Sequence, residues 1–208
     1  MKNVTLQLFV ILCFALPVYS QDAERSTLSS IGRVETVEGA NFGTGTGFVA
    51  REIETDSGTS YEVWTAAHVV ERVGQQVSIR FDVGSENEKL VVGVVTYRKY
   101  DSEHDAAVIE CEGDPPRHVL RIASSEVGDV AYFAGYSGRY RWRAIRIIAS
   151  SIRGIGGVRL FVPESSPGES GAPVWTSNGV SGVVTAYTET AVKRLMMHPI
   201  SHWVDRDK

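Results

Sequence analysis

The stretch Pro167-Gly168-Glu169-Ser170-Gly171-Ala172-Pro173 places one serine between two glycines in the C-terminal part of a 208-residue chain. A serine hydroxyl is a weak nucleophile at neutral pH and needs a nearby base and N–H groups that stabilise an oxyanion. Gly168 and Gly171 lack a Cβ atom, so the backbone can turn successive N–H groups to one side of Ser170. Such stretches also form ordinary turns, so this one predicts catalysis only together with partners elsewhere in the chain.

Two further stretches offer such partners. Trp64-Thr65-Ala66-Ala67-His68-Val69-Val70 ends a predicted strand and carries His68 between small residues, which would let another segment approach the imidazole closely. His104-Asp105-Ala106-Ala107-Val108-Ile109 begins another predicted strand with an acid. Taken singly, His68 is readily explained as a structural histidine and Asp105 as a turn residue. Together with Ser170 they occur in the order His, Asp, Ser, which indicates a nucleophilic triad.

The alternative order, Ser before acid before His, belongs to α/β-hydrolases. His198 and His202 do follow Ser170, but the chain between them shows no alternation of helices and strands. The heptapeptide also carries Ala172 where a nucleophile elbow has its second glycine. We therefore reject an α/β-hydrolase.

The rest of the chain predicts an all-β fold. Short runs rich in β-branched and aromatic residues are separated by Gly, Asp, Ser and Asn, as in a β-sandwich or a pair of barrels. These runs are residues 47–50, 61–65, 76–81, 90–95, 106–110, 130–134, 142–149, 159–162, 173–175 and 180–187. One short C-terminal helix is predicted over 199–206, because Ile200, Trp203 and Val204 have helical spacing.

The composition indicates one globular domain with a sizeable core, since 43% of residues are hydrophobic and 22% charged. The formal net charge of −4 gives no sign of a nucleic-acid or anionic-membrane partner. Residues 139–146 alternate basic and aromatic side chains, and this period of two favours a strand with one basic face over a nucleic-acid stacking site.

The first 20 residues resemble a signal peptide, with Lys2, an apolar run over 6–16 and a cleavage-like end at residues 18–20. The run is too short for a membrane span. We expect export to the periplasm or the outside, a short extension over 21–30 and one domain over 31–208. Cys111 is then the single remaining cysteine, so we expect a buried inert thiol and neither an internal disulfide nor a cysteine-based metal site.

Four motifs in sequence resemble those of trypsin-like serine proteases, and most closely the bacterial, HtrA-like branch without a PDZ domain. They are the stretch Gly43-Thr44-Gly45-Thr46-Gly47-Phe48-Val49, the stretches around His68 and Asp105, and Gly168 to Pro173. The similarity spans residues 31–205. It implies two antiparallel six-stranded β-barrels with the active site in the cleft between them, and a polypeptide substrate with no cofactor and no metal.

The resemblance also implies roles for single residues. His68 would be the general base, Asp105 would orient it, and Ser170 would attack the scissile carbonyl to form an acyl-enzyme. The N–H groups of Gly168 and Ser170 would form the oxyanion hole. The expected activity is that of a secreted serine endopeptidase, with a monomer as the default. The alternative is a catalytically silent trypsin-like fold that binds a peptide or protein.

Substrate recognition and activation are less determined by the sequence. Thr185, Ala186 and Tyr187 lie in a stretch that resembles the strand pairing with the substrate backbone. Glu164 falls where trypsin has the acid of its specificity pocket, which would favour Lys or Arg substrates, although the sequence favours a solvated surface glutamate over this role. Glu169 replaces the usual Asp before the serine, and no basic cleavage site precedes Ile31, so activation by a freed N-terminus is not expected.

Overall fold

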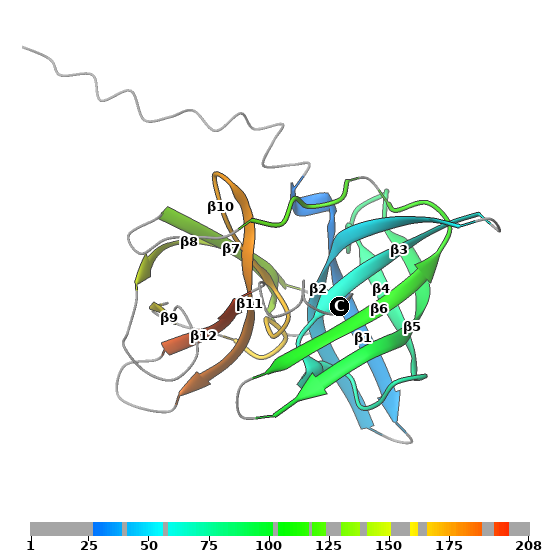
Figure 1. Ribbon diagram of the computed structural model, residues 1–208, viewed down its shortest axis with the longest axis horizontal. Coiled ribbons are helices and arrows are strands. Elements are labelled where there is room, and N and C mark those ends of the chain that lie inside the picture. The colour runs from blue at the N-terminus through cyan, green and yellow to red at the C-terminus, as the bar shows by residue number, and fades with distance from the viewer. Residues whose placement is uncertain are drawn as a thin grey trace, which may run out of the picture.

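The computed structural model describes residues 27–38, 41–55, 58–101, 104–116, 118–123, 130–137, 141–150, 159–161, 166–188 and 194–199. These residues form twelve strands in two sheets and one short 3₁₀ turn, and residues 27–29 before the first strand are helical. Figure 1 shows the two sheets side by side. The prediction of an all-β chain is therefore confirmed for the described residues.

The first sheet is a closed barrel with the strand order β1-β2-β3-β6-β5-β4. Its strands are β1 (Ile31–Glu38), β2 (Asn41–Thr55), β3 (Gly58–Thr65), β4 (Gln76–Phe81), β5 (Lys89–Tyr100) and β6 (Asp105–Glu112). One hydrophobic cluster fills this barrel, and Phe81, Ile79 and Tyr61 in it are fully buried. Alternating side chains of each strand point inward, as the period of two in a strand requires.

The second sheet follows the order β10-β11-β12-β9-β8-β7, in which the last strand pairs with the first. Its strands are β7 (Val130–Ser137), β8 (Arg141–Ser150), β9 (Arg159–Phe161), β10 (Pro173–Thr176), β11 (Gly179–Thr188) and β12 (Arg194–Pro199).

A second hydrophobic cluster joins the two sheets. It combines Phe48, Trp64 and Val108 of the barrel with Ala134 and Val183 of the second sheet. The segment between the sheets contributes to the same junction, because the Leu120 N–H donates to the Val49 carbonyl and the Ala123 N–H to the Val180 carbonyl. Packing and backbone hydrogen bonds thus fix one sheet against the other.

The sequence-based prediction misses the strands β1 and β12. Strand β1 carries Arg33 and Glu35 at alternate positions, and buried Arg33 forms an ion pair with Glu35 at 3.2 Å, while its buried Nε–H has no hydrogen-bond partner among the described residues. Strand β12 contains two methionines and ends in Pro199, which has no N–H to donate. Pro199, the first residue of the predicted helix, is the last residue of β12, and the rest of that helix lies outside the described residues.

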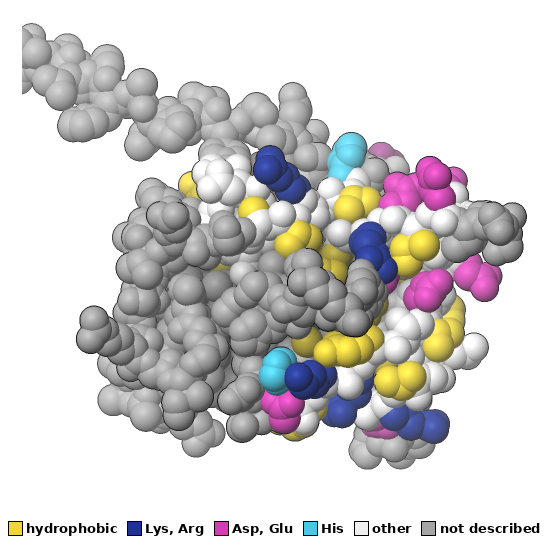
Figure 2. All heavy atoms as spheres, in the orientation of Figure 1, with side chains coloured by type: hydrophobic (Ala, Val, Ile, Leu, Met, Phe, Trp, Pro, Cys, Tyr) yellow, Lys and Arg dark blue, Asp and Glu magenta, His cyan; other side chains and the backbone are white. Residues whose placement is uncertain are grey.

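Figure 2 shows acidic, basic and hydrophobic side chains mixed on the barrel face that carries β5 and β6 in Figure 1. The exposed hydrophobic residues include Leu90 and Val92 of β5. Among the described helical residues, none forms a segment long and apolar enough to cross a membrane. Residues 141–146 of the basic stretch lie in β8, so the predicted strand is confirmed there. The structure does not describe the side chains of these residues.

Candidate active site

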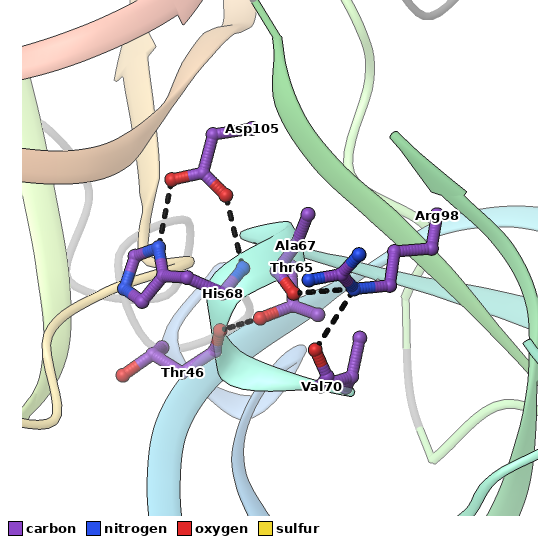
Figure 3. A network of polar contacts seen from close by, with 7 residues as sticks. All are labelled: Thr46, Thr65, Ala67, His68, Val70, Arg98 and Asp105. Atoms are coloured by element: carbon purple, nitrogen blue, oxygen red, sulfur yellow. Dashed lines mark hydrogen bonds and ion pairs between the residues drawn. The ribbon is translucent and has the colours of Figure 1, made fainter. Parts of the chain in front are cut away.

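The structure brings His68 and Asp105 into direct contact. His68 lies in a 3₁₀ turn, η1 (Ala67–Val69), that directly follows β3, and Asp105 is the first residue of β6. The β3–β6 ladder pairs Thr65 with Ala107, so Asp105 extends beyond the end of β3 toward the turn. The imidazole Nδ1 lies 2.7 Å from one carboxylate oxygen, and the His68 backbone N–H donates to the other at 3.0 Å (Figure 3).

This contact sets the direction of the imidazole ring. An ionised carboxylate only accepts hydrogen bonds, so a neutral His68 carries its proton on Nδ1 and presents the Nε2 lone pair on the opposite side. The Asp105 side chain is 9% exposed, whereas that of His68 is 34% exposed. The acid is therefore shielded from water while the ring remains open to a substrate.

Arg98 of β5 contacts the same turn through two backbone carbonyls. Its Nε–H group lies 3.0 Å from both the Ala67 and the Val70 carbonyl oxygens, which flank His68 in the sequence (Figure 3). The guanidinium also lies 5.4 Å from the centre of the Tyr100 ring. A cation at the carbonyl end of a short helical turn stabilises that turn. Sequence reasoning missed Arg98, because its contact with the turn depends on the pairing of β5 with β6.

Ser170 lies in the loop that enters β10, and hydrogen bonds hold this loop on both sides. The Thr46 N–H of β2 donates to the Ser170 carbonyl at 2.7 Å, and the Thr46 hydroxyl donates to the Gly168 carbonyl at 2.8 Å. On the other side, the Gly171 N–H donates to the Val184 carbonyl of β11 at 2.6 Å. The loop is thus clamped between the barrel and the second sheet.

Two glycines bring the Ser170 loop against the segment that carries His68. A Cβ atom on Gly45 would overlap Val69, the neighbour of His68, and would lie 3.1 Å from the Ser170 carbonyl oxygen. A Cβ atom on Gly171 would overlap the Thr46 carbonyl and the Thr65 hydroxyl, and would lie 3.0 Å from the Ala66 nitrogen. The backbone of the Ser170 loop therefore lies against the segment that carries His68, at the junction of the two sheets.

The backbone N–H groups of the loop fall into two sets. Those of Glu169, Gly171 and Ala172 donate to the carbonyls of Ser166, Val184 and Glu169, respectively. Among the residues that the structure describes, no acceptor is found for the N–H groups of Gly168 and Ser170. Gly168 has a φ of +97° and Gly171 of +88°, which favour glycine. The loop thus offers two N–H groups to a ligand.

Glu169 is buried in this loop, with 1% of its surface exposed, and its carboxylate accepts a hydrogen bond from the Ser166 N–H at 2.9 Å. Ile31 begins β1 opposite Phe48 and is fully buried. Insertion of a new N-terminus at Ile31 beside Glu169 would remove this residue from its strand. The expectation about activation stays a prediction, because the structure is that of the uncleaved chain.

The predicted substrate-recognition residues are only partly described. Thr185 lies in β11 and is buried, with 2% of its surface exposed. Ala186 and Tyr187 also lie in β11, but their side chains are not described. Glu164 lies outside the described residues, so its role remains a prediction.

Cys111 is buried in the barrel core, as the sequence predicts. It lies opposite Tyr61 in the β3–β6 ladder. Burial raises the pKa of the Cys111 thiol to about 12, and burial likewise raises the pKa of Tyr61. Since the thiolate is the reactive form, Cys111 is inert at neutral pH.

Comparison with protein families shows that residues 45–184 match the trypsin-like peptidase domain. This match includes His68, Asp105 and Ser170. No curated protein matches the chain.

Several solved structures share the fold. The chain is similar to a serine endoprotease from Yersinia pestis, with 18% identity and a TM-score of 0.68 over 89% of this chain and 64% of that one. It is similar to the active form of a protease from M. tuberculosis, with 21% identity and a TM-score of 0.69 over 88% and 81% of the two chains. It also resembles AlgW, an HtrA-type protease solved with a tripeptide, at 15% identity and a TM-score of 0.69.

The chain covers 64% of the Yersinia pestis protein and 61% of AlgW, whereas 89% of this chain is matched in both comparisons. These structural similarities therefore concern the fold of the chain.

Proposed function

Because the chain belongs to the trypsin-like peptidase family, we propose that it is a serine endopeptidase with His68, Asp105 and Ser170 as its catalytic triad. The active site would lie between two complete six-stranded barrels. The observation that carries the proposal is the double contact of Asp105 with His68, at 2.7 Å to the ring and 3.0 Å to the backbone N–H, at the junction where the Ser170 loop is clamped.

In the proposed reaction the Nε2 atom of His68 takes the proton of the Ser170 hydroxyl. The hydroxyl oxygen attacks the scissile carbonyl, and the resulting imidazolium gives its proton to the leaving amine. An acyl-enzyme remains, and a water molecule activated by the same imidazole hydrolyses it. Asp105 would keep the imidazole in the required tautomer and stabilise its positive charge.

The carbonyl oxygen becomes negatively charged in the tetrahedral intermediate. The N–H groups of Gly168 and Ser170 are suited to stabilise this charge by donating hydrogen bonds to the oxygen, because neither donates to a described residue. A donor of this kind typically lowers the barrier by about 3 kcal/mol. The backbone of the loop would thus supply the electrostatic part of the catalysis.

Strand β11 supports binding of an extended peptide. Its ladder with β10 ends at the Pro173–Val183 pair, whereas its ladder with β12 continues to Thr188 and Arg194. Among the described strands, residues 186–188 therefore pair on one side only. We propose that the substrate backbone adds to the other side by β-augmentation, and that Glu164 favours basic side chains in the substrate.

We also propose export, with cleavage after residue 20 and removal of the signal peptide. N-terminal sequencing of the chain recovered from the periplasm or the medium tests this part of the proposal. An N-terminus at Met1 in the recovered protein would contradict it.

Labelling with a fluorophosphonate tests the catalytic proposal. We expect stoichiometric labelling of the wild type at Ser170, and its loss in Ser170→Ala and His68→Ala. Hydrolysis of fluorescent casein should be lost in the same two variants. Glu164→Ala should then reduce cleavage after Lys and Arg in a peptide library if Glu164 lies in the specificity pocket.

The controls distinguish a failed site from a failed fold. Each variant should show the circular dichroism spectrum and the melting temperature of the wild type within a few degrees. A folded wild-type protein that reacts with neither the fluorophosphonate nor casein would overturn the enzymatic proposal. That outcome would favour a silent fold that captures a peptide or protein.

A further inference from the structure

Thr46 of β2 uses all of its polar atoms at the junction of the two sheets. Its N–H donates to the Ser170 carbonyl at 2.7 Å, and its carbonyl accepts from the Thr65 hydroxyl at 2.7 Å (Figure 3). Its hydroxyl donates to the Gly168 carbonyl at 2.8 Å and accepts from the Tyr136 N–H of β7 at 3.0 Å. The residue is fully buried. One residue, through its backbone and its hydroxyl, thus connects the barrel, the second sheet and the Ser170 loop.

The bond from Tyr136 fixes which way the Thr46 hydroxyl donates. A hydroxyl has one hydrogen and two acceptor positions, and the Tyr136 N–H points at the oxygen. The hydroxyl hydrogen is then directed at the Gly168 carbonyl oxygen. Tyr136 is itself buried, with 5% of its surface exposed. The Thr46 bond to Gly168 therefore has a defined direction and is shielded from water.

Gly135 shows how closely this arrangement is packed. A Cβ atom at this position would lie 3.0 Å from the Ala172 Cβ and 3.1 Å from the Thr46 hydroxyl oxygen. Strand β7 can therefore approach both Thr46 and the Ser170 loop because residue 135 has no side chain. The hydroxyl is enclosed by protein on the sides of β7 and the loop.

Gly168 needs such a constraint. With φ at +97° and no side chain, its neighbouring peptide groups can rotate at low cost. Each peptide group is planar, so a fixed carbonyl also fixes the N–H of the next residue. Thr46 holds the carbonyls of Gly168 and Ser170, which fixes the Gly168–Glu169 and Ser170–Gly171 peptide groups. The Ser170 N–H belongs to the peptide group between these two, and the Gly168 N–H to the group just before them, so holding the two planes restricts the rotation of both N–H groups.

We propose that Thr46 is a positioning residue, whose hydroxyl keeps the N–H groups of Gly168 and Ser170 directed at the substrate oxyanion. The inference rests on the proposed peptidase function. Thr46 is not one of the reacting groups, and it acts by fixing the Gly168 carbonyl and with it the Gly168–Glu169 peptide plane. Without the hydroxyl, the buried Gly168 carbonyl and Tyr136 N–H both lose a partner, and the loop gains alternative orientations.

The test compares Thr46→Val, which keeps the shape and removes the hydroxyl, with Thr46→Ser, which keeps the hydroxyl. We expect Thr46→Val to lower kcat for fluorescent casein and the rate of fluorophosphonate labelling about 10- to 100-fold, up to the effect of losing one oxyanion donor. KM should change less than threefold. Thr46→Ser should restore most of the rate. The pH midpoint of labelling should stay unchanged, because the His68–Asp105 contact is intact.

A matched control is Thr176→Val. Thr176 is also buried, and its hydroxyl also accepts a backbone N–H, from Asn178 at 3.1 Å, but it lies in β10 away from the Gly168 carbonyl. We expect its labelling rate to equal that of the wild type. If Thr46→Val does not fold, Thr46→Ala replaces it as a smaller variant without the hydroxyl.

Amide hydrogen exchange over residues 168–172 gives a readout that needs no catalysis. Faster exchange there in Thr46→Val, with the rest of the protein unchanged, supports the inference even if the wild type fails to react and the peptidase proposal falls. Exchange and labelling equal to the wild type would overturn it. Equal losses in Thr46→Ser and Thr46→Val would also overturn it, because the methyl group would then be responsible.

Discussion

The two halves of the candidate active site are held by different kinds of interaction. His68 and Asp105 both belong to the first barrel, and side chains hold them, through the carboxylate of Asp105 and the guanidinium of Arg98. The Ser170 loop belongs to the second sheet, and mostly backbone groups hold it, through the carbonyls of Ser170 and Val184. Glycines rather than side chains allow its close approach to the barrel.

This difference has a physical reason. The general base must turn one particular ring nitrogen to the substrate, and a charged side chain can fix a ring through a strong hydrogen bond. The oxyanion site must present backbone N–H groups in a fixed direction, and hydrogen bonds of the neighbouring peptide groups can hold them there. We therefore expect loss of a charge to impair the His68–Asp105 half, and an added side-chain atom to impair the Ser170 loop.

The largest effect is expected for Gly171→Ala. The new Cβ atom would overlap the Thr46 carbonyl and the Thr65 hydroxyl, and φ is +88°. Left-handed strain and overpacking together should cost about 2–5 kcal/mol in the free energy of unfolding. Fluorophosphonate labelling should disappear. Urea denaturation and labelling measure the two effects.

Gly74→Ala is the matched control for Gly171→Ala. Its φ is +82°, but a Cβ atom there would meet nothing within 4 Å. The strain alone should cost about 1–2 kcal/mol, and labelling should be unchanged. Equal losses of labelling in the two variants would contradict the idea that close approach to the barrel positions Ser170.

A smaller but still large effect is expected for Asp105→Asn. The amide can accept from only one of the two His68 donors, so the ring loses its preferred tautomer. We expect kcat to fall about 10⁴-fold with little change in KM. Hydrolysis of fluorescent casein measures both parameters.

Asp101→Asn provides the comparison for Asp105→Asn. Asp101 likewise contacts both the N–H and the Nδ1 of His104, each at 2.8 Å, but it uses a single carboxylate oxygen for both and its side chain is 45% exposed. We expect wild-type activity in this variant. A comparable loss there would mean that the acidic segment as a whole, and not the Asp105 contact, sets the activity.

The smallest effect is expected for Arg98→Met, which keeps the unbranched stem as far as the Nε position and removes all of the guanidinium N–H groups. Loss of the two contacts to the turn should lower the free energy of unfolding by about 1 kcal/mol, because the guanidinium is partly exposed. The labelling rate should fall less than tenfold. Calorimetry and fluorophosphonate labelling measure the two effects.

Arg72→Met is the control, because Arg72 is exposed, and it should change neither the melting temperature nor the labelling rate. An unchanged melting temperature in Arg98→Met would show that the η1 turn holds its shape without Arg98.

The sequence predicted the candidate catalytic residues better than the residues that hold them in place. The order of His68, Asp105 and Ser170, the strands and the buried thiol follow from motifs and from periodicity along the chain. The roles of Arg98 and of the Thr46 hydroxyl were missed. Thr46 lies in a quoted motif, but its bond to Gly168 spans 122 residues, and no local pattern reports a contact of that range.

The sequence by itself determined the residue types, their order and the all-β class, because turn residues and side-chain periodicity act within a few positions of each other. The tertiary structure alone decided how these groups meet. The pairing of Thr65 with Ala107 carries Asp105 to His68, and a slip of one residue would turn the Asp105 side chain to the other face. The packing of two sheets, made possible by glycines at their contact, then brings the Ser170 loop against the segment that carries His68.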